Sequence, residues 1–600
     1  MAGCGSSANT TLTKQWQTEV GEEARTVAVE PTRGHLLVGM RKETTVFDAS
    51  GTKIRGDEEG GLSGLVNQAK EAANQMASVP SASQMSANEL DYVILSDPGL
   101  ALAFDYSATN DIIRAIDLGT GQEQWTQTDY RWSLEKYQAT GQGVATEITE
   151  EAGLASGVAA SEVNSELTRS RYVENLVTPV PGANAILLKT VSQLHRIDLE
   201  TGEADWSISD VLGSRLLGTE RLPSGDLILA VGNASLLDAV TGSEQVLRLD
   251  PESGEVAWRN DHGARALRDL QVRDGYLSLT NTEGQLEAYR LDDGTQTLEA
   301  DPGWQMGQLS TLALSGEYKG TRYSVPLTTS PVPQNGQVYA PAVVDRQTVG
   351  DPDLGIQKYA LTSGEQAWTS GPVETMRDVR DLTFVDDHVV GRVTRGRPGA
   401  LTGDSYQRVV AWSPSDGSIA WNRKMPHTPS DVHAIRVKAF GQSRLPALNL
   451  VADDSQVYTV NDTSVVAIDV ASGEVTQHAP LSVEGASTWL TEAGPNTLLV
   501  LRKEGIEFYD SSDLSRTSSP IRFDAPLVTF ERTGDHLFAQ TEDALYAVNV
   551  PRQTLAGRIP IEGAGGLVSG NLRSGVVPTD DGQAVFVLTE KRIAQKYRIP

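Results

Sequence analysis

The residue types that most often do chemistry are present in this chain, but their spacing matches no known catalytic motif. The eight histidines are scattered, and none of them belongs to an HExxH motif that would bind zinc. His427 and His433 stand near each other in MPHTPSDVH, with a spacing that matches no metal-binding pattern. Two acidic stretches, DPDLG and TDDGQ, match only part of a calcium loop. No GxSxG elbow, P-loop or dinucleotide-binding glycine signature occurs. We therefore predict no catalytic residue, no metal site and no cofactor.

The single cysteine, Cys4, stands near the start of the chain in MAGCGSSANTT. The small residues Ala2 and Gly3 precede it, and a stretch of Gly, Ser, Asn and Thr follows. This arrangement resembles the end of a bacterial lipoprotein signal, in which the cysteine becomes lipidated. We expect residues 1–12 to be a lipid-anchor tether with Cys4 as its lipidation site. The alternative is an accidental cysteine in a flexible terminus.

The charge and composition restrict the classes of partner. The chain has 50 Lys and Arg against 79 Asp and Glu, which gives a net charge of −29. Such a charge repels a phosphate backbone, so we expect no nucleic-acid partner. No run of about 18 apolar residues occurs, which is the length that a membrane-spanning helix needs. We therefore expect contact with a membrane through a lipid anchor only. The 56 glycines and 9 phenylalanines are typical of a turn-rich, all-β chain.

One short phrase recurs along the chain and predicts the elements that position every other residue. In RLDPESGEVAWRN, an alternating apolar stretch ends at Asp250, a turn follows at Gly254, and Trp258 comes four residues later. Gly adopts the positive φ that such a turn needs, and the chain then returns as a second strand. Each copy is therefore predicted to be a β-hairpin. The predicted turn glycines are Gly51, Gly121, Gly202, Gly254, Gly294, Gly364, Gly417 and Gly473. Two degenerate copies without the glycine follow, at 507–516 and 546–555.

A tryptophan at a fixed place in each hairpin predicts a seam that is built in the same way each time, sheet against sheet. The predicted seam residues are Trp16, Trp125, Trp206, Trp258, Trp368 and Trp421. A further pair of strands precedes most hairpins, so four strands per repeat are expected. Repeated four-stranded sheets with a glycine turn and a late tryptophan resemble the PQQ-type β-propeller family, in which a tryptophan of each blade packs on the next. The resemblance extends from about Thr26 to the end of the chain.

The resemblance implies an all-β fold, a large β-propeller of four-stranded antiparallel blades, eight or more in number, over residues 13–600. Two propellers in tandem are the alternative. The last segment, residues 584–600, has two strands but no returning strand with a tryptophan. TKQWQTEV, residues 13–20, is an orphan strand that would complete this last blade and remove an open edge.

Two insertions, at 58–90 and 130–175, interrupt the predicted repeats. Apolar residues at helical spacing in 62–79 predict an amphipathic helix, and aromatic residues lead into the second insertion. Long insertions in a propeller are common places for partners to dock. The residues predicted to contact a protein partner are Leu62, Leu65, Val66, Met76, Tyr130, Trp132 and Tyr137. The alternative is that the helix packs on the propeller itself.

Quinoprotein dehydrogenases of this family hold PQQ and Ca²⁺ with carboxylate and amide ligands, and many have a disulfide between adjacent cysteines. One cysteine cannot form that disulfide, and no matching ligand set maps onto this chain. The nearest analogue in the family is the propeller lipoprotein of the outer-membrane protein assembly machinery, which also lacks PQQ. It has eight shorter blades without these insertions, so its partner is not carried over.

The resemblance, together with the lack of a recognisable catalytic motif in the sequence, implies a non-catalytic, extracytoplasmic scaffold or binding protein of the bacterial cell envelope. We expect it to be lipid-anchored to the cell membrane and to act through a protein partner. The alternative is an enzyme, either a PQQ-dependent dehydrogenase or a hydrolase with a loop-built site.

Overall fold

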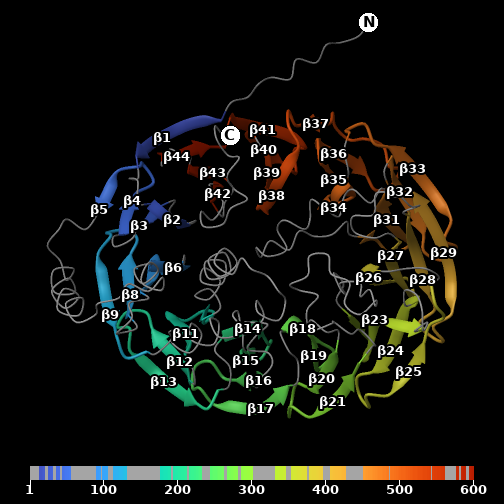
Figure 1. Cartoon of the computed structure of the whole chain (residues 1–600), viewed down its shortest axis with the longest axis horizontal. Coiled ribbons are helices and arrows are strands. Elements are labelled where there is room, and N and C mark those ends of the chain that lie inside the picture. Colours follow the sequence, from blue (N-terminus) through green and yellow to red (C-terminus); the bar gives the residue numbers. More distant parts are fainter. Residues whose placement is uncertain are drawn as a thin grey trace, which may run out of the picture. The chain divides into compact units, whose positions relative to one another are not determined.

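Each predicted hairpin is a pair of antiparallel strands in the computed structural model (Figure 1). The structure describes residues 12–19, 24–30, 35–40, 44–55, 90–95, 98–105, 112–130, 176–190, 193–211, 215–232, 244–262, 267–281, 285–301, 331–345, 353–373, 378–395, 406–426, 450–461, 463–484, 487–541, 543–560, 576–579, 583–588 and 593–599. Within these residues, the strands form eleven sheets of four strands each, all antiparallel. The protein is thus an all-β propeller of eleven four-stranded blades, and the predicted fold class is confirmed.

The chain divides into two compact units. Unit 1 comprises Met1–Leu216, Thr529–Asn549 and Leu555–Pro600, and unit 2 comprises Leu217–Val528 and Val550–Thr554. Because unit 1 contains both ends of the chain, the units are not the consecutive halves that two propellers in tandem would form.

Five blades lie wholly or mainly in unit 1. They are β1 (Thr13–Glu19) with β42 (Val576–Pro578), β43 (Ala584–Leu588) and β44 (Ile593–Arg598); β2 (Ala24–Glu30), β3 (His35–Met40), β4 (Thr44–Phe47) and β5 (Lys53–Arg55); β6 (Leu90–Leu95), β7 (Leu100–Asp105), β8 (Ile112–Asp117) and β9 (Glu123–Gln127); β10 (Val177–Pro179), β11 (Ala185–Lys189), β12 (Gln193–Asp198) and β13 (Ala204–Ser209); and β38 (Leu527–Thr533), β39 (His536–Thr541), β40 (Ala544–Asn549) and β41 (Thr554–Pro560).

Six blades lie wholly or mainly in unit 2. They are β14 (Arg215–Arg221), β15 (Leu227–Gly232), β16 (Glu244–Leu249) and β17 (Val256–His262); β18 (Leu267–Arg273), β19 (Tyr276–Asn281), β20 (Leu286–Arg290) and β21 (Gln296–Ala300); β22 (Val332–Gln334), β23 (Gln337–Asp345), β24 (Asp353–Ala360) and β25 (Gln366–Thr369); β26 (Asp378–Val385), β27 (His388–Arg395), β28 (Tyr406–Trp412) and β29 (Ile419–Pro426); β30 (Val451–Ala452), β31 (Gln456–Val460), β32 (Ser464–Asp469) and β33 (Val475–Pro480); and β34 (Ser487–Gly494), β35 (Thr497–Arg502), β36 (Gly505–Asp510) and β37 (Ile521–Arg522).

The turn between the third and fourth strands explains the recurring phrase. All eight predicted turn glycines have a positive φ, between 67° and 83°. In the phrase that contains Gly254, Asp250 Oδ1 accepts the N–H of Glu252 at 2.8 Å, and Ser253 Oγ accepts the N–H of Glu255 at 3.2 Å. The hydrogen bond from the Glu252 N–H, followed by one from the Ser253 side chain, lowers the pKa of Asp250. In the two degenerate copies, Leu514 and Gln553 take the positive φ instead, at 52° and 55°.

The first strand completes the last blade, as predicted. β1 pairs antiparallel with β44, from Thr13 opposite Arg598 to Glu19 opposite Ile593. The blade therefore contains strands from both ends of the chain, in the order β1, β44, β43, β42. This pairing covers the edge of β44 that would otherwise be open.

The hydrophobic core lies between successive blades as well as within them. One cluster joins Ile228 and Val246 of one blade to Leu277 and Tyr289 of the next, and all four side chains are buried. Within a blade, the central strands are buried on both faces, as in β15 and β39. A blade therefore depends on its neighbours for part of its core.

The predicted insertions and tether lie almost entirely outside the described residues. Only Leu12 of the tether, Leu90 of the first insertion and Tyr130 of the second are described. Among the residues that are described, no helix has the length and apolar character needed to cross a bilayer.

Candidate functional site

The tryptophans of the hairpins share one position in the strand register. Each lies in the fourth strand of its blade, and a bulge in the pairing comes directly after the residue opposite it. The pairs are Trp125 with Ala115, Trp206 with Arg196, Trp258 with Arg248, Trp368 with Lys358, and Trp421 with Ala411. Trp125 and Trp258 are 9% and 8% exposed, whereas the other three are half-buried. The five tryptophans therefore occupy equivalent positions in their strands, but their side chains are buried to different extents.

Four of these tryptophans make the same contact with the next blade. Each indole N–H donates to the main-chain carbonyl that stands three residues before the next turn glycine. The donors Trp125, Trp258, Trp368 and Trp421 reach the carbonyls of Leu199, Leu291, Pro414 and Val470 at 2.9, 2.8, 3.1 and 2.6 Å. The ring then covers the glycine itself, because a Cβ added to Gly294 would lie 2.6 Å from Cδ2 of Trp258. The turn glycine is thus required both for its positive φ and for the space that the indole occupies.

Two blades of unit 2 build the same seam without tryptophan. Leu298 takes the position in β21, and a Cβ on Gly364 would meet the main chain of Thr297 and Leu298. Gln477 takes the position in β33, and its Nε2 donates to the carbonyl of Ser512 at 2.8 Å. Leu298 and Gln477 each stand four residues after a turn glycine, so this spacing predicts both seam residues from the sequence.

Trp16 stands opposite Lys596 in the closing blade, and its side chain is outside what the structure describes. Lys596 Nζ donates to the carbonyl of Ala49, in the turn after β4, at 3.2 Å. Lys358, which stands opposite Trp368, donates in the same way to the carbonyl of Pro414 at 2.8 Å. The register therefore places Trp16 at the seam position, and sequence reasoning missed the cation beside it.

Tyr130 is buried where the second predicted insertion begins. Its side chain is 9% exposed, and its hydroxyl donates to the carbonyl of Gly202 at 3.1 Å. Its ring centroid lies 5.1 Å from that of His195 in an edge-on arrangement, and burial raises the pKa of Tyr130 to about 12. Leu176, the first described residue after the gap, belongs to the same hydrophobic cluster. Both described ends of the 131–175 segment are thus held by one cluster, and a contact of Tyr130 with a partner stays a prediction.

A chain of hydrogen bonds runs through the blade that Tyr130 contacts. Lys189 Nζ donates to the carbonyl of Thr190 at 2.6 Å, Thr190 Oγ1 lies 3.2 Å from His195 Nε2, and His195 Nδ1 lies 2.8 Å from Ser207 Oγ. Lys189 is fully buried, and burial lowers its pKa to about 7. Burial, and then the charge of Lys189, lower the pKa of His195 to about 4.

The contact between Ser207 and His195 has the form of a nucleophile with its base, since Ser207 is exposed. The second ring nitrogen of His195 meets the hydroxyl of Thr190, however, where a catalytic triad has a carboxylate. A base with a pKa of about 4 accepts a proton poorly near neutral pH. The arrangement is therefore a polar network that holds β11, β12 and β13 together, without the features of an activated serine.

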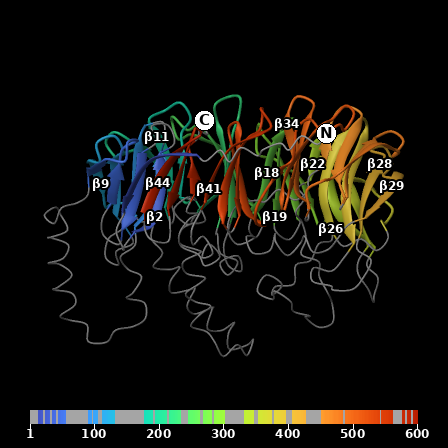
Figure 2. The same ribbon diagram turned by 90° about the horizontal axis from the view of Figure 1, so that it is seen from above.

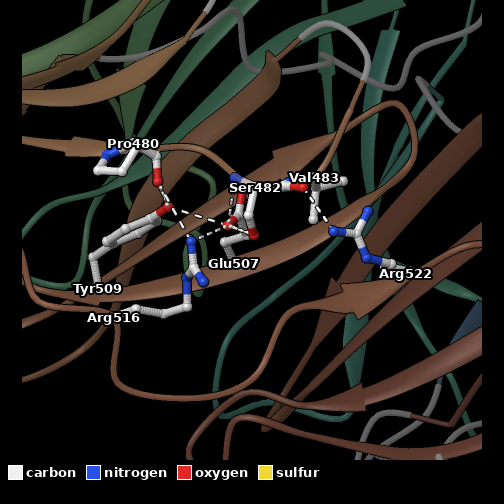
Figure 3. A network of polar contacts seen from close by, with 7 residues as sticks. All are labelled: Pro480, Ser482, Val483, Glu507, Tyr509, Arg516 and Arg522. Atoms are coloured by element: carbon white, nitrogen blue, oxygen red, sulfur yellow. Dashed lines mark hydrogen bonds and ion pairs between the residues drawn. The ribbon is translucent and has the colours of Figure 1, made fainter. Parts of the chain in front are cut away.

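A buried carboxylate in unit 2 is enclosed by donors (Figure 3). Glu507 of β36 is fully buried, and its Oε1 accepts the main-chain N–H of Ser482 at 3.0 Å and the hydroxyls of Ser482 and Tyr509 at 2.8 and 3.2 Å. Its Oε2 accepts the N–H of Val483 at 3.2 Å, and Arg516 forms an ion pair with it through Oε1 at 3.1 Å. Through these hydrogen bonds, Glu507 links the segment between β33 and β34 to β36 of blade β34–β37.

Two other side chains in Figure 3, those of Tyr509 and Arg522, donate to main-chain carbonyls at the end of β33 and just after it. Tyr509 donates to the carbonyl of Pro480 at 3.1 Å, and Arg522 donates to that of Ser482 at 2.7 Å. Burial and the charge of Glu507 raise the pKa of Tyr509 to about 12. Tyrosines two residues after a Glu or Gln recur in three other blades, as Tyr289 with Glu287, Tyr359 with Gln357, and Tyr597 with Gln595. This spacing was a signal that sequence reasoning missed.

Several predicted functional residues fall outside the described ranges. They are Cys4, Leu62, Leu65, Val66, Met76, Trp132 and Tyr137. His427 and His433 also lie outside them. The roles predicted for Cys4 and for the residues of the two insertions therefore stay predictions.

A quinone cofactor with Ca²⁺ would need a convergent set of carboxylate and amide ligands. No three His, Cys, Asp or Glu side chains in the described part of the chain are grouped as metal ligands would be. The buried acids Glu287 and Glu507 instead accept hydrogen bonds from tyrosines of their own strands. The described residues do not fit this cofactor.

Several solved structures resemble the chain distantly. BamB from Moraxella catarrhalis has 10% identity and a TM-score of 0.30, over 70% of this chain and 96% of that one. A europium-containing methanol dehydrogenase has 11% identity and a TM-score of 0.33, over 62% and 84%. The computationally designed Ika8 protein has 10% identity and a TM-score of 0.34, over 64% and 95%. None of the curated proteins compared with the chain matches it.

A family model matches the chain more directly. The model described as outer membrane protein assembly factor BamB matches residues 190–321 and 311–506, which together make up just over half of the chain. The matched region includes the hairpins that contain Gly254, Gly294, Gly364, Gly417 and Gly473. The chain therefore belongs to this PQQ-like β-propeller repeat family.

Proposed function

We propose that this protein is a non-catalytic scaffold of the bacterial cell envelope, held at the membrane by a lipid on Cys4, which acts by binding another protein. One observation carries the proposal. Several polar side chains buried in the described blades, among them His195 and Glu507, make hydrogen bonds that hold strands and blades together. The description of the family model, an outer membrane protein assembly factor, supports a role in the envelope.

The lipid anchor is supported by Ala2 and Gly3 before Cys4. When the protein is expressed with a bacterial lipoprotein signal ahead of Cys4, we expect it to partition into the detergent phase, and Cys4→Ala to partition into the aqueous phase. Because one acyl chain gives only marginal membrane binding, the expected modification has two or more chains. Equal partitioning of the two forms would contradict the anchor.

The partner surface is proposed on the two insertions, with Leu62, Leu65, Val66 and Met76 in the first and Trp132 and Tyr137 in the second. Tyr130 and Leu176 hold both ends of the 131–175 segment in one cluster, so a short Gly/Ser linker can replace this segment without removing a described strand. We expect this replacement to leave the thermal unfolding temperature nearly unchanged and to abolish recovery of a cross-linked partner from membranes. Deletion of 62–79 is the matched variant for the other insertion. Full recovery of the partner with both variants would contradict the proposal.

The competing hypothesis is an enzyme. The exposed Ser207, hydrogen-bonded to His195, is the described contact that favours a hydrolase. We expect the wild-type protein and Ser207→Ala to hydrolyse a p-nitrophenyl ester equally slowly. A hydrolysis rate that Ser207→Ala abolishes would support the enzyme instead. An absorbance change on adding PQQ and Ca²⁺ would support a quinoprotein.

A further inference from the structure

We infer that an anchor attached ahead of Leu12 turns one particular edge of the unit 1 blades toward the lipid surface. The inference builds on the proposed lipid at Cys4 and adds which surface then stays open to a partner. It follows from the place of β1 in its blade.

The two edges of a blade differ in which turns and chain connections lie at them. In blade β10–β13, the turns at 180–184 and 199–203 lie at one edge, which we call the turn edge. The chain enters β10 and leaves β13 at the other edge, which we call the connection edge. Antiparallel order gives every blade the same arrangement. In Figure 2 the strands of unit 1 stand upright, so the two edges of these blades are at the top and bottom of the view.

The chain leaves the closing blade at its turn edge. β1 takes the place of the fourth strand, and its first residue, Thr13, stands opposite Arg598, the last residue of β44. Leu12 is 3% exposed, lies in a cluster with Tyr597, and donates its N–H to the carbonyl of Arg558 at 3.4 Å. The position of the chain is therefore fixed up to Leu12.

The turn edge of one blade contacts a strand of the neighbouring blade at three places in unit 1. Lys596 in β44 donates to Ala49, in the turn after β4. Trp125 in β9 donates to Leu199, in the turn after β12. Leu12, at the turn edge of the closing blade, donates to Arg558 in β41. Neighbouring blades of unit 1 are thus packed together at and beside their turn edges.

The tether is too short to let the connection edge face the membrane. Leu12 is eight residue steps from Cys4, and this length of chain spans at most about 29 Å when fully extended. Running back along β1 to the connection edge would use about 23 Å, at roughly 3.3 Å per residue. Almost no length would then be left to reach the lipid. A lipid on Cys4 therefore keeps the turn edge nearest to the membrane.

The charge of the turn edge is consistent with a tether as the only attachment. The exposed or partly exposed acids in its described turns include Asp48, Asp117, Asp198, Glu200, Glu203 and Asp535, and the exposed bases there include Lys53 and Arg552. Acidic groups are repelled by an anionic lipid surface and do not adsorb to it. The connection edge, where β5, β9 and β41 end and β6, β10 and β42 begin, then faces away from the lipid. That edge borders segments 56–89, 131–175 and 561–575, so a soluble partner would have access to it.

The test uses the only cysteine of the chain as a chemical anchor. The protein is coupled through Cys4 to maleimide lipid in vesicles, and a donor dye is placed on an azide-bearing amino acid at position 200 or 209. Glu200 lies in a turn at the turn edge, and Ser209 ends β13 at the connection edge of the same blade; both are exposed. An acceptor dye is carried by the lipid headgroups. We expect a larger loss of donor fluorescence at 200 than at 209.

Equal losses at 200 and 209, or a larger loss at 209, would overturn the inference. The matched control is Cys4→Ser with each probe, which we expect to show no loss of donor fluorescence on anionic vesicles. A loss in this control would mean that another surface binds lipid, and it would also overturn the inference. Because the anchor is chemical, these results are independent of whether Cys4 is lipidated in cells, which the detergent partitioning above tests separately.

Discussion

The contact between a turn glycine and the preceding tryptophan leads to a test at Gly294. This residue has a φ of 71°, and a Cβ added to it would lie 2.6 Å from Cδ2 of Trp258. Gly294→Ala therefore changes two things, the backbone conformation and the packing of the indole. Gly336 provides the matched control. It has a φ of 67°, and a Cβ added there would meet no atom within 4 Å.

The expected magnitudes follow from these two terms. An L-residue at positive φ costs about 1–2 kcal/mol relative to glycine, so Gly336→Ala should lower the free energy of unfolding by about that amount. Gly294→Ala adds the cost of forcing a side chain into a filled space, about 1–3 kcal/mol. We therefore expect Gly294→Ala to destabilise the protein by about 2–5 kcal/mol in total.

The assay is urea unfolding of the full chain, with the change in transition midpoint converted by a common slope. The second step repeats Gly294→Ala in a Trp258→Leu background, in which the ring is absent. There the cost of Gly294→Ala should fall toward that of Gly336→Ala, because the coupling between the two sites is lost. Equal costs for Gly294→Ala and Gly336→Ala in the wild-type background would refute the reasoning.

Three further outcomes are expected in unfolding experiments. Glu507→Gln should lower the free energy of unfolding by about 1–3 kcal/mol, because it leaves buried donors unmatched, whereas the exposed Glu474→Gln should change it by less than about 0.5 kcal/mol. Lys189 has a folded pKa of about 7 and an unfolded value of about 10.4, so the unfolded state binds the extra proton between them. The free energy of unfolding should therefore rise from pH 7 to pH 10, by up to about 4 kcal/mol, and Lys189→Met should remove this rise. His195 has a folded pKa of about 4 against about 6.5 unfolded, so acidification from pH 6.5 to 4 should lower the free energy of unfolding by up to about 3 kcal/mol, and His195→Gln should remove that dependence.

The parts of the fold that depend on local sequence were predictable. A strand, an Asp, a glycine turn and a returning strand lie within about a dozen residues, so the phrase around Gly254 contains most of what specifies its hairpin. The closing strand was predictable by counting, because residues 584–600 lack a fourth strand and residues 13–20 are an orphan strand. The pairing of β16 with β17 confirms the hairpin, and the pairing of Thr13 with Arg598 confirms the closing strand.

The polar networks were not predictable, because they join residues that are far apart in the sequence. Glu507 binds main-chain groups 24 and 25 residues earlier, and Trp125 donates to a carbonyl 74 residues later. The burial of Lys189 likewise depends on the sheets around it. Tyr130 was predicted, with Trp132 and Tyr137, to form the aromatic start of an insertion, and its ring packs on His195, 65 residues away in the sequence. Such contacts are set by the tertiary arrangement of the blades.

The most direct test of the proposed scaffold function is the recovery of a cross-linked partner from native membranes. The protein, expressed with a bacterial lipoprotein signal ahead of Cys4, is compared with the variant in which a Gly/Ser linker replaces 131–175 and the variant that lacks 62–79. The scaffold account predicts that one defined protein is cross-linked to the wild type, and that at least one variant loses it while keeping the wild-type unfolding temperature. Undiminished cross-linking in both variants, or no cross-linked protein with the wild type, would contradict the account.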